Sequence, residues 1–162
     1  MAFAARRALL AALLTVGVGG SAIASTATGT LTVRVLVQPN CTVSSTTLDF
    51  GSYVTTQATA LNGAGNIAYT NCPAGQLKFE LDGGANGTVT ARKMSNGAGG
   101  LLNYALYRDA ARTLSFAQGA NAKTVTQTVT GSGTVPFYGA IPGAQAVAEG
   151  TYTDTVQITL TF

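Results

Sequence analysis

The sequence contains no histidine and no tryptophan, only two cysteines, and few charged residues, which make up 9% of its 162 positions. Without histidine, neither a Ser-His-Asp nor a Cys-His catalytic arrangement can form. The six acidic residues are scattered, and Glu80 and Asp82 are the closest pair. They share a predicted strand face with Lys78, so we interpret them as solvated surface charges rather than as the buried acid pair of a glycosidase. The composition therefore predicts no enzyme, no metal site, no cofactor and no small-molecule substrate.

Residues 1–24 have the pattern of a secretory signal peptide. Arg6 and Arg7 precede an apolar run over residues 8–18, and Ala22-Ile23-Ala24 is a small-x-small cleavage pattern. A membrane anchor is the alternative, but the apolar run is shorter than the roughly 20 residues that a bilayer span needs. Cleavage after Ala24 leaves 138 residues, the size of one domain, with a net charge of +1. That charge offers no electrostatic argument for nucleic-acid binding.

Cys41 and Cys72 are the only cysteines. In an exported chain an even pair of cysteines predicts a disulfide. A metal site or a redox dithiol would want closer spacing or histidine partners. Closing a loop of 31 residues contributes about 3–4 kcal/mol to stability in the chain-entropy model.

An alternating apolar stretch follows the predicted cleavage site. Within residues 29–37, one face of an extended strand would carry Leu31, Val33, Val35 and Val37, and the other would carry Thr30, Thr32, Arg34 and Leu36. This period of two, with β-branched residues, is typical of a half-buried strand. A strand at a free chain end buries its apolar face either in its own domain or in another molecule.

The remaining chain shows many short strand patterns and no sustained helical period. We expect strands at 42–45, 48–54, 67–72, 76–82, 88–94, 101–107, 124–130 and 134–140, and a loop at 55–66. Pro136 favours an edge or bulged position for its strand. Residues 151–162 alternate throughout, with Tyr152, Asp154, Val156, Ile158, Leu160 and Phe162 on one face. The pattern predicts an all-β sandwich or barrel.

Three motifs resemble the spore coat protein U family, which includes Csu-type pilin subunits of archaic chaperone–usher pili. Residues 104–113 are similar to its Y-x-L-Y-x-D-x-x-R-T segment. Residues 135–141 are similar to V-P-x-[FY]-G-x-[IL], and residues 150–162 to G-x-Y-x-D-x-[VL]-x-[VI]-x-[VL]-x-[FY]. Cys41 and Cys72 match the position of the family's disulfide, and the resemblance covers essentially the whole chain after residue 24.

The resemblance implies an incomplete immunoglobulin-like sandwich with Greek-key topology, completed by a donor strand from outside. It implies three parts: a signal peptide at 1–24, a donor-strand arm at 25–38 and a pilin domain at 39–162. Leu31, Val33, Val35 and Val37 would fill a groove flanked by a neighbour's Val156, Ile158, Leu160 and Phe162. This is β-augmentation between chains.

The function that the resemblance implies is that of a structural subunit of a surface pilus, supporting adhesion or biofilm formation. Its expected partners are neighbouring copies, a periplasmic chaperone and an outer-membrane usher. The chain would pass through the periplasm to a cell-surface fimbrium. From the residues alone, a self-contained secreted coat or carbohydrate-binding sandwich is the alternative, with the arm paired inside its own domain.

Overall fold

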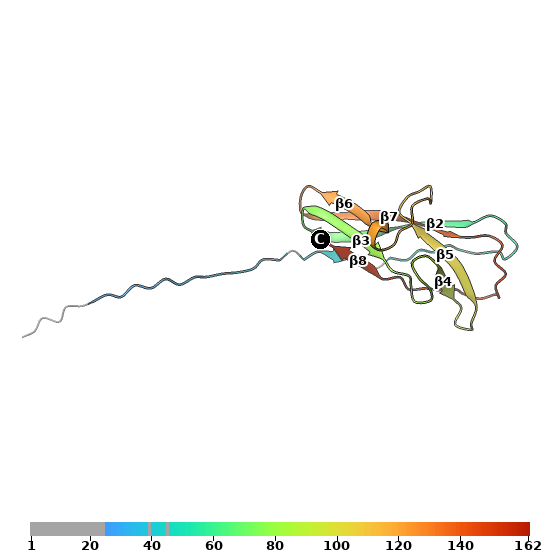
Figure 1. Ribbon diagram of the computed structural model, residues 1–162, viewed down its shortest axis with the longest axis horizontal. Helices are drawn as coiled ribbons and strands as arrows, with labels where there is room; N and C mark the ends of the chain where they lie inside the picture. Colours follow the sequence, from blue (N-terminus) through green and yellow to red (C-terminus); the bar gives the residue numbers. More distant parts are fainter. Residues whose placement is uncertain (1–24, 39, 45) are drawn as a thin grey trace, which may run out of the picture. The chain divides into compact units, whose positions relative to one another are not determined.

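The computed structural model describes residues 25–38, 40–44 and 46–162, so the predicted signal peptide lies outside the described residues (Figure 1). The chain divides between Leu36 and Val37 into two units. Residues 25–38 form neither strand nor helix, so the predicted strand at 29–37 has no hydrogen-bonded partner within the described chain. No described helix is both long and apolar enough to cross a bilayer.

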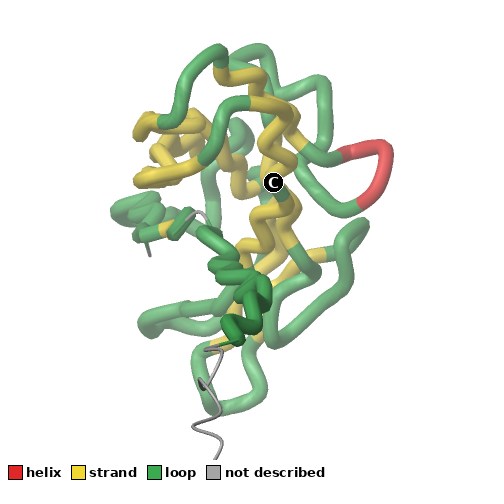
Figure 2. The backbone as a smooth tube through the Cα atoms, turned by 90° about the vertical axis from the view of Figure 1, so that its left-hand side faces the viewer, coloured by secondary structure: helices red, strands yellow, loops and turns green. Residues whose placement is uncertain are grey.

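The second unit is an antiparallel β-sandwich. Its eight strands are β1 (Thr42–Val43), β2 (Leu61–Cys72), β3 (Gly75–Leu81), β4 (Arg92–Ser95), β5 (Leu101–Tyr107), β6 (Lys123–Gln127), β7 (Gly131–Ile141) and β8 (Ile158–Thr161). One sheet has the order β1-β2-β7-β5-β4 and the other β6-β3-β8. This non-sequential order, with connections that cross between two sheets, is that of an immunoglobulin-like sandwich. The short 3-10 turn at Gly119–Asn121 (red in Figure 2) is the helical segment among the described residues.

The core lies between the two sheets and follows from the alternation of the strands. In β3, Leu77, Phe79 and Leu81 are buried, whereas Lys78 and Glu80 face outward. The rings of Phe79 and Tyr69 lie 5.5 Å apart and join β3 to β2 across the core. The all-β fold predicted from the period-two patterns is therefore confirmed, and the central strands bury their apolar faces in the core.

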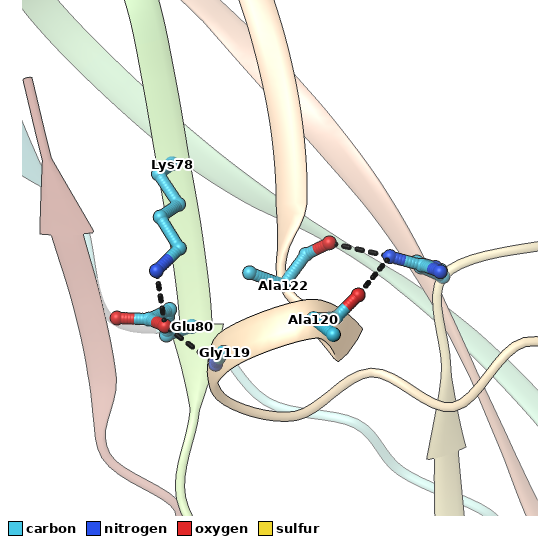
Figure 3. A network of polar contacts seen from close by, with 6 residues as sticks. Lys78, Glu80, Gly119, Ala120 and Ala122 are labelled. Atoms are coloured by element: carbon cyan, nitrogen blue, oxygen red, sulfur yellow. Dashed lines mark hydrogen bonds and ion pairs between the residues drawn. The ribbon is translucent and has the colours of Figure 1, made fainter.

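Glu80 lies on the outer surface of the three-stranded sheet and bonds to Lys78 of the same strand and to the backbone at Gly119. Its Oε1 lies 2.7 Å from Lys78 Nζ and accepts a hydrogen bond from Gly119 N (Figure 3). These bonds from Lys78 and Gly119 lower the pKa of the Glu80 carboxyl. In the same region, Arg108 donates to the carbonyl oxygens of Ala120 and Ala122.

The prediction of a loop over 55–66 is wrong from Leu61 onward, because β2 begins there. The Asn-Gly and Gly signals lie inside a long ladder with β7, in which Gly63 pairs with Gly139 and Gly65 with Phe137. A Cβ at Gly65 would lie 2.7 Å from Phe137 Cζ. Glycine is required here because the Phe137 ring of the facing strand covers the backbone. In the sequence alone, a glycine that serves this purpose looks the same as a turn glycine.

Other predicted strands are shorter or absent, and those at 42–45 and 124–130 end early, at Val43 and Gln127. Residues 48–54 form no strand, although Leu48 and Phe50 pack against the core. Of residues 88–94, only Arg92–Met94 belong to a strand, because Thr88 and Ala91 exchange backbone hydrogen bonds in a tight turn. Local alternation does not decide whether a neighbouring strand is present to pair with.

Pro136 lies on an interior strand of the five-stranded sheet, not on an edge strand. The β5 pairing of β7 covers Tyr138–Ala140 and stops before Pro136, which faces Asn66 of β2 on its other side. The missing N–H of proline is thus tolerated because no strand pairs with this part of β7 on the β5 side.

Candidate strand-accepting groove

A cavity of about 610 Å³ reaches into the core between the two sheets. Core side chains from both sheets line it, namely Ile67, Leu81, Tyr104, Leu106 and Phe137. One side is formed by Tyr152–Ile158, and the other by Val43, Ser44, Thr46, Thr47, Leu48 and Phe50. We call this cavity the groove. Apolar core residues that line an accessible cavity are a favourable site for an apolar ligand or chain segment.

The first side of the groove is the segment Thr46–Phe50, here named the N-terminal wall. Among the described residues, this segment makes no backbone–backbone hydrogen bond to another element. Its Leu48 and Phe50 side chains instead rest on the Gly63–Gly139 pair of the β2–β7 ladder. A Cβ at Gly139 would lie 2.6 Å from Leu48 Cδ2 and 2.6 Å from Phe50 Cζ. The wall is therefore held by side-chain packing on two glycines.

The second side is the segment Tyr152–Gln157, here named the C-terminal rim. Even-numbered residues of the rim are half-buried and odd-numbered residues are exposed, as in a strand. No ladder forms, however, until β8 begins at Ile158. Asp154, Thr155 and Val156 make no backbone–backbone hydrogen bonds within the described chain. The prediction of a strand over 151–162 is therefore confirmed for Ile158–Thr161 only.

Both sides of the groove border open sheet edges. β1 is the terminal strand of the five-stranded sheet, and β8 is the terminal strand of the three-stranded sheet. Within the described part of the chain, β8 pairs only with β3, through residues 158–161. An unpaired edge presents a row of N–H and C=O groups that a further strand can bind. The groove thus combines an apolar interior with free backbone groups along its rim.

A second cavity of about 430 Å³ continues the groove. The two cavities share Leu48, Phe50, Met94 and Tyr152 in their linings. The second one extends toward Tyr53 and the loop around Val147. The accessible region is therefore elongated along the C-terminal rim, as a strand-shaped ligand would require.

Two of the four predicted groove-flanking residues line the groove and two do not. Val156 and Ile158 line the groove. Leu160 packs against the core, and Phe162 is 53% exposed. Their role in binding a strand remains a prediction. The sequence analysis did not assign Leu48 and Phe50 to the groove. The only sequence signal for them is their spacing of two residues, which places both side chains on one face of an extended segment.

The predicted donor residues Leu31, Val33, Val35 and Val37 have exposed fractions of 83–88%. Leu36, on the opposite face of the alternating stretch, is 80% exposed. Exposure therefore does not distinguish the two faces of the arm. Their assignment as donor residues stays a prediction.

The predicted disulfide between Cys41 and Cys72 is present. It joins the chain just before β1 to the end of β2, and the Cys72 side is fully buried. The N-terminal wall lies inside the loop that this disulfide closes. The bond therefore fixes the start of the wall to the central ladder.

A buried polar cluster lies beside the groove. Tyr104 Oη donates to Asp154 Oδ2 over 2.6 Å. Desolvation and then this hydrogen bond raise the pKa of Tyr104, so its hydroxyl stays a donor. Arg92 is 2% exposed and donates to the carbonyl oxygens of Leu81, Asp82 and Phe116, and desolvation lowers its pKa. These groups make structural hydrogen bonds, and no described group of His, Cys, Asp and Glu side chains could hold a metal ion.

The residues of the Y-x-L-Y-x-D-x-x-R-T segment build a braced turn. Asp109 accepts hydrogen bonds from the backbone N–H groups of Thr113 and Leu114. This turn directs Arg112, at φ 56°, to donate to the carbonyl oxygens of Gly63 and Gly139. The motif therefore supports, from outside, the same glycine pair on which the N-terminal wall rests.

The Spore Coat Protein U domain model matches residues 27–159. The chain belongs to the Spore Coat Protein U domain family. Residues 104–113, 135–141 and 150–162 fall within or overlap the matched range, so the resemblance seen in these motifs is confirmed. A search of curated proteins finds no match.

Two solved pilus structures resemble this Spore Coat Protein U domain chain. One is a chain of the CsuC–CsuE chaperone–tip adhesion subunit pre-assembly complex from archaic chaperone–usher Csu pili of Acinetobacter baumannii. It has a TM-score of 0.57 and 18% identity, and the match covers 78% of the present chain and 40% of that chain. The other is the P pilus rod subunit PapA, with a TM-score of 0.52, 17% identity, and 75% and 97% coverage. The present chain thus spans less than half of the first, and both likenesses show the sandwich fold.

Proposed function

We propose that this protein is a structural subunit of a surface pilus and that the arm of a neighbouring copy fills its groove. The observation that carries the proposal is the groove itself, which is lined by core side chains and lies between the N-terminal wall and a C-terminal rim with few backbone–backbone hydrogen bonds. A sandwich that lacks one strand has this geometry. The arm, residues 25–38, supplies a strand pattern that has no ladder in the described chain.

The dimensions of the arm suit the groove. The alternating stretch Leu31–Val37 would span about 20 Å as a strand, at roughly 3.3 Å per residue. The rim and β8 together offer the extended segment 152–161 for pairing. A strand bound there would face Val156 and Ile158 and would donate to and accept from the free backbone groups of the rim. This is β-augmentation, in which main-chain bonds give affinity and alternate side chains give specificity.

The energetic gain is substantial. Leu31, Val33, Val35 and Val37 are almost fully exposed, and full burial would stabilise each by about 1.5–3 kcal/mol before the cost of ordering the arm. Half-buried apolar residues of the groove lining, such as Leu48 and Val156, would be covered at the same time. Occupancy of the groove therefore favours a linear chain of subunits, each donating one arm and accepting another.

The proposal extends to partners and location. A periplasmic chaperone would cover the groove before assembly, and an outer-membrane usher would exchange it for the arm of the next copy. Export would use residues 1–24 as a signal peptide, and the final location would be a cell-surface fimbrium supporting adhesion or biofilm formation. The part after residue 38 would be the pilin domain. Such a subunit has no enzymatic role.

The decisive experiment separates the two faces of the arm. In full-length chains, Val33→Asp or Val35→Asp should abolish or strongly reduce the ladder of polymers in non-denaturing gels, because a charge would enter the apolar groove. Arg34→Asp is the matched control and should polymerise nearly as the unmodified chain does, since its side chain points away. Equal polymerisation of all three variants would refute the donor assignment.

A deletion supplies a second test. A chain without residues 25–37 should bind a chaperone but should not polymerise, because it keeps the groove and lacks the arm. Fibres formed by this truncated chain would contradict the proposal. Expression in the periplasm without a chaperone should give aggregation or degradation, whereas a stable monomer would support the self-contained coat or carbohydrate-binding module instead.

A further inference from the structure

The C-terminal rim keeps an extended conformation although it has almost no ladder. Within the rim, only Thr153 and Gln157 form backbone–backbone hydrogen bonds in the described structure, with Ser95 and Asp82 respectively. The three residues between them, Asp154, Thr155 and Val156, make no backbone–backbone hydrogen bonds within the described chain. An extended segment without a neighbouring strand gains nothing from ladder bonds, so another interaction has to hold it.

Asp154 supplies that interaction from the centre of the rim. Its Oδ2 accepts from Tyr104 Oη at 2.6 Å, and its Oδ1 accepts from Ala85 N at 2.9 Å and Asn86 Nδ2 at 3.0 Å. These partners lie on β5 and on the β3–β4 connection. One half-buried carboxylate thus ties the rim to β5 and to the β3–β4 connection.

The β3–β4 connection is shaped to meet this carboxylate. A Cβ at Gly84, which has φ 77°, would lie 2.0 Å from Asp154 Oδ2. Asp82 continues the link, because its Oδ1 accepts from Gly84 N and from Gln157 N, each at 2.9 Å. Asp154 and Asp82 therefore bind the same loop to two points of the rim, on either side of Val156.

We propose that Asp154, oriented by Tyr104, is a positioning residue that holds the empty groove's rim ready to pair with an incoming strand. The inference rests on the proposed function for its ligand. If the rim is ordered in advance, the strand does not have to order it on binding, and association is faster. After binding, the new ladder holds the rim, so the side-chain bonds contribute little to the dissociation rate.

The test uses full-length chains that carry Val33→Asp and Val35→Asp, so that their own arms do not compete. Three further changes are compared in this background: Tyr104→Phe, Asp154→Ala and, as control, Tyr107→Phe. Tyr107 lies on the same strand, is half-buried, and its hydroxyl makes no hydrogen bond in the described structure. Asp154→Asn keeps an oxygen that accepts from Ala85 N. Its exchange and association rates should therefore lie between those of the background chain and those of Asp154→Ala.

The first readout is amide hydrogen exchange, which needs no ligand. The amides of Thr153 and Gln157 bond to Ser95 O and Asp82 Oδ1, not to Asp154. Tyr104→Phe and Asp154→Ala should speed their exchange about tenfold, as expected when local opening becomes easier. The core amide of Phe79 should be unchanged in Tyr104→Phe, which separates rim opening from global unfolding. Unchanged exchange at Thr153 and Gln157 would overturn the inference.

The second readout is the binding kinetics of a synthetic peptide with the sequence of residues 29–38. Relative to the background chain, Tyr104→Phe should lower the association rate about tenfold and change the dissociation rate by no more than about twofold. Tyr107→Phe should change neither rate. A loss of affinity confined to the dissociation rate would overturn the inference. If the peptide does not bind the background chain at all, the proposed function fails, and the exchange experiment still decides the role of Asp154.

Discussion

A methyl group at Gly139 should dislodge the N-terminal wall of the groove. Gly139 pairs with Gly63 in the β2–β7 ladder, and its Cα faces the Leu48 and Phe50 side chains. In Gly139→Ala the new Cβ would lie 2.6 Å from Leu48 Cδ2 and from Phe50 Cζ, well inside contact distance. The ladder is long and the wall has no backbone bonds to other elements, so the wall is the part that should move.

The magnitude follows from these contacts. Overpacking of this kind costs about 1–3 kcal/mol of unfolding free energy. Gly131→Ala is the matched control on the same strand, because its nearest atom would be at 3.8 Å and its φ is not positive. That change should stabilise by about 0.4–1 kcal/mol through the unfolded chain. The same unfolded-chain gain applies to Gly139→Ala, so the two variants should differ by the overpacking cost of about 1–3 kcal/mol.

Urea unfolding of both variants measures this difference, and a second change identifies its origin. Combining Gly139→Ala with Phe50→Ala should cost less than the sum of the two single changes, because the smaller side chain leaves room for the methyl group. The binding rate of the peptide of residues 29–38 should also fall in Gly139→Ala. Equal stability of Gly139→Ala and Gly131→Ala, or strict additivity with Phe50→Ala, would refute the role assigned to the glycine pair.

Three further outcomes are expected. Cys41→Ser should lower the unfolding free energy by about 3–4 kcal/mol, and titration of the unmodified exported protein should find no free thiol. Arg112→Ala should lower the unfolding free energy in urea by about 1–3 kcal/mol, because the carbonyl oxygens of Gly63 and Gly139 lose a charged donor. A decrease below about 0.5 kcal/mol would contradict the supporting role assigned to Arg112. Desolvation raises the pKa of Asp109, but the bonds from Leu114 and Thr113 outweigh it and lower that pKa. Its stabilisation should therefore be full above the unfolded-state pKa and lost as the pH falls through the lowered one, and Asp109→Asn should flatten this part of the pH–stability curve.

The alternation of apolar residues predicted most of the sandwich. The strand at Leu101–Tyr107 has the expected bounds, and β3 buries the expected face. Predictions failed where a partner elsewhere in the fold decides the outcome. Gly63 looks like a turn residue, yet it lies in a strand because it pairs with Gly139 of β7, and Leu48 and Phe50 pack above it. A single sequence carries no record of what faces each glycine.

The groove illustrates the same division. The family resemblance implies that Val156 and Ile158 flank a strand-accepting groove; both line the cavity, and their role in binding a strand stays a prediction. Leu48 and Phe50 looked like part of an ordinary strand, and only the packing of the chain makes them a wall without a ladder. The role of Asp154 also depends on distant residues, because its partners are 50 or more positions away in the chain.

The sequence by itself determined the all-β class, the pairing of two lone cysteines and the apolar face of residues 31–37, because these follow from local periodicity and composition. Only the tertiary structure decided where strands end for lack of a partner and which core residues are left beside an open edge. Strand patterns state what a segment can bury, and they do not state whether its own domain supplies the neighbour. The groove between the N-terminal wall and the C-terminal rim lies where the domain supplies no neighbouring strand.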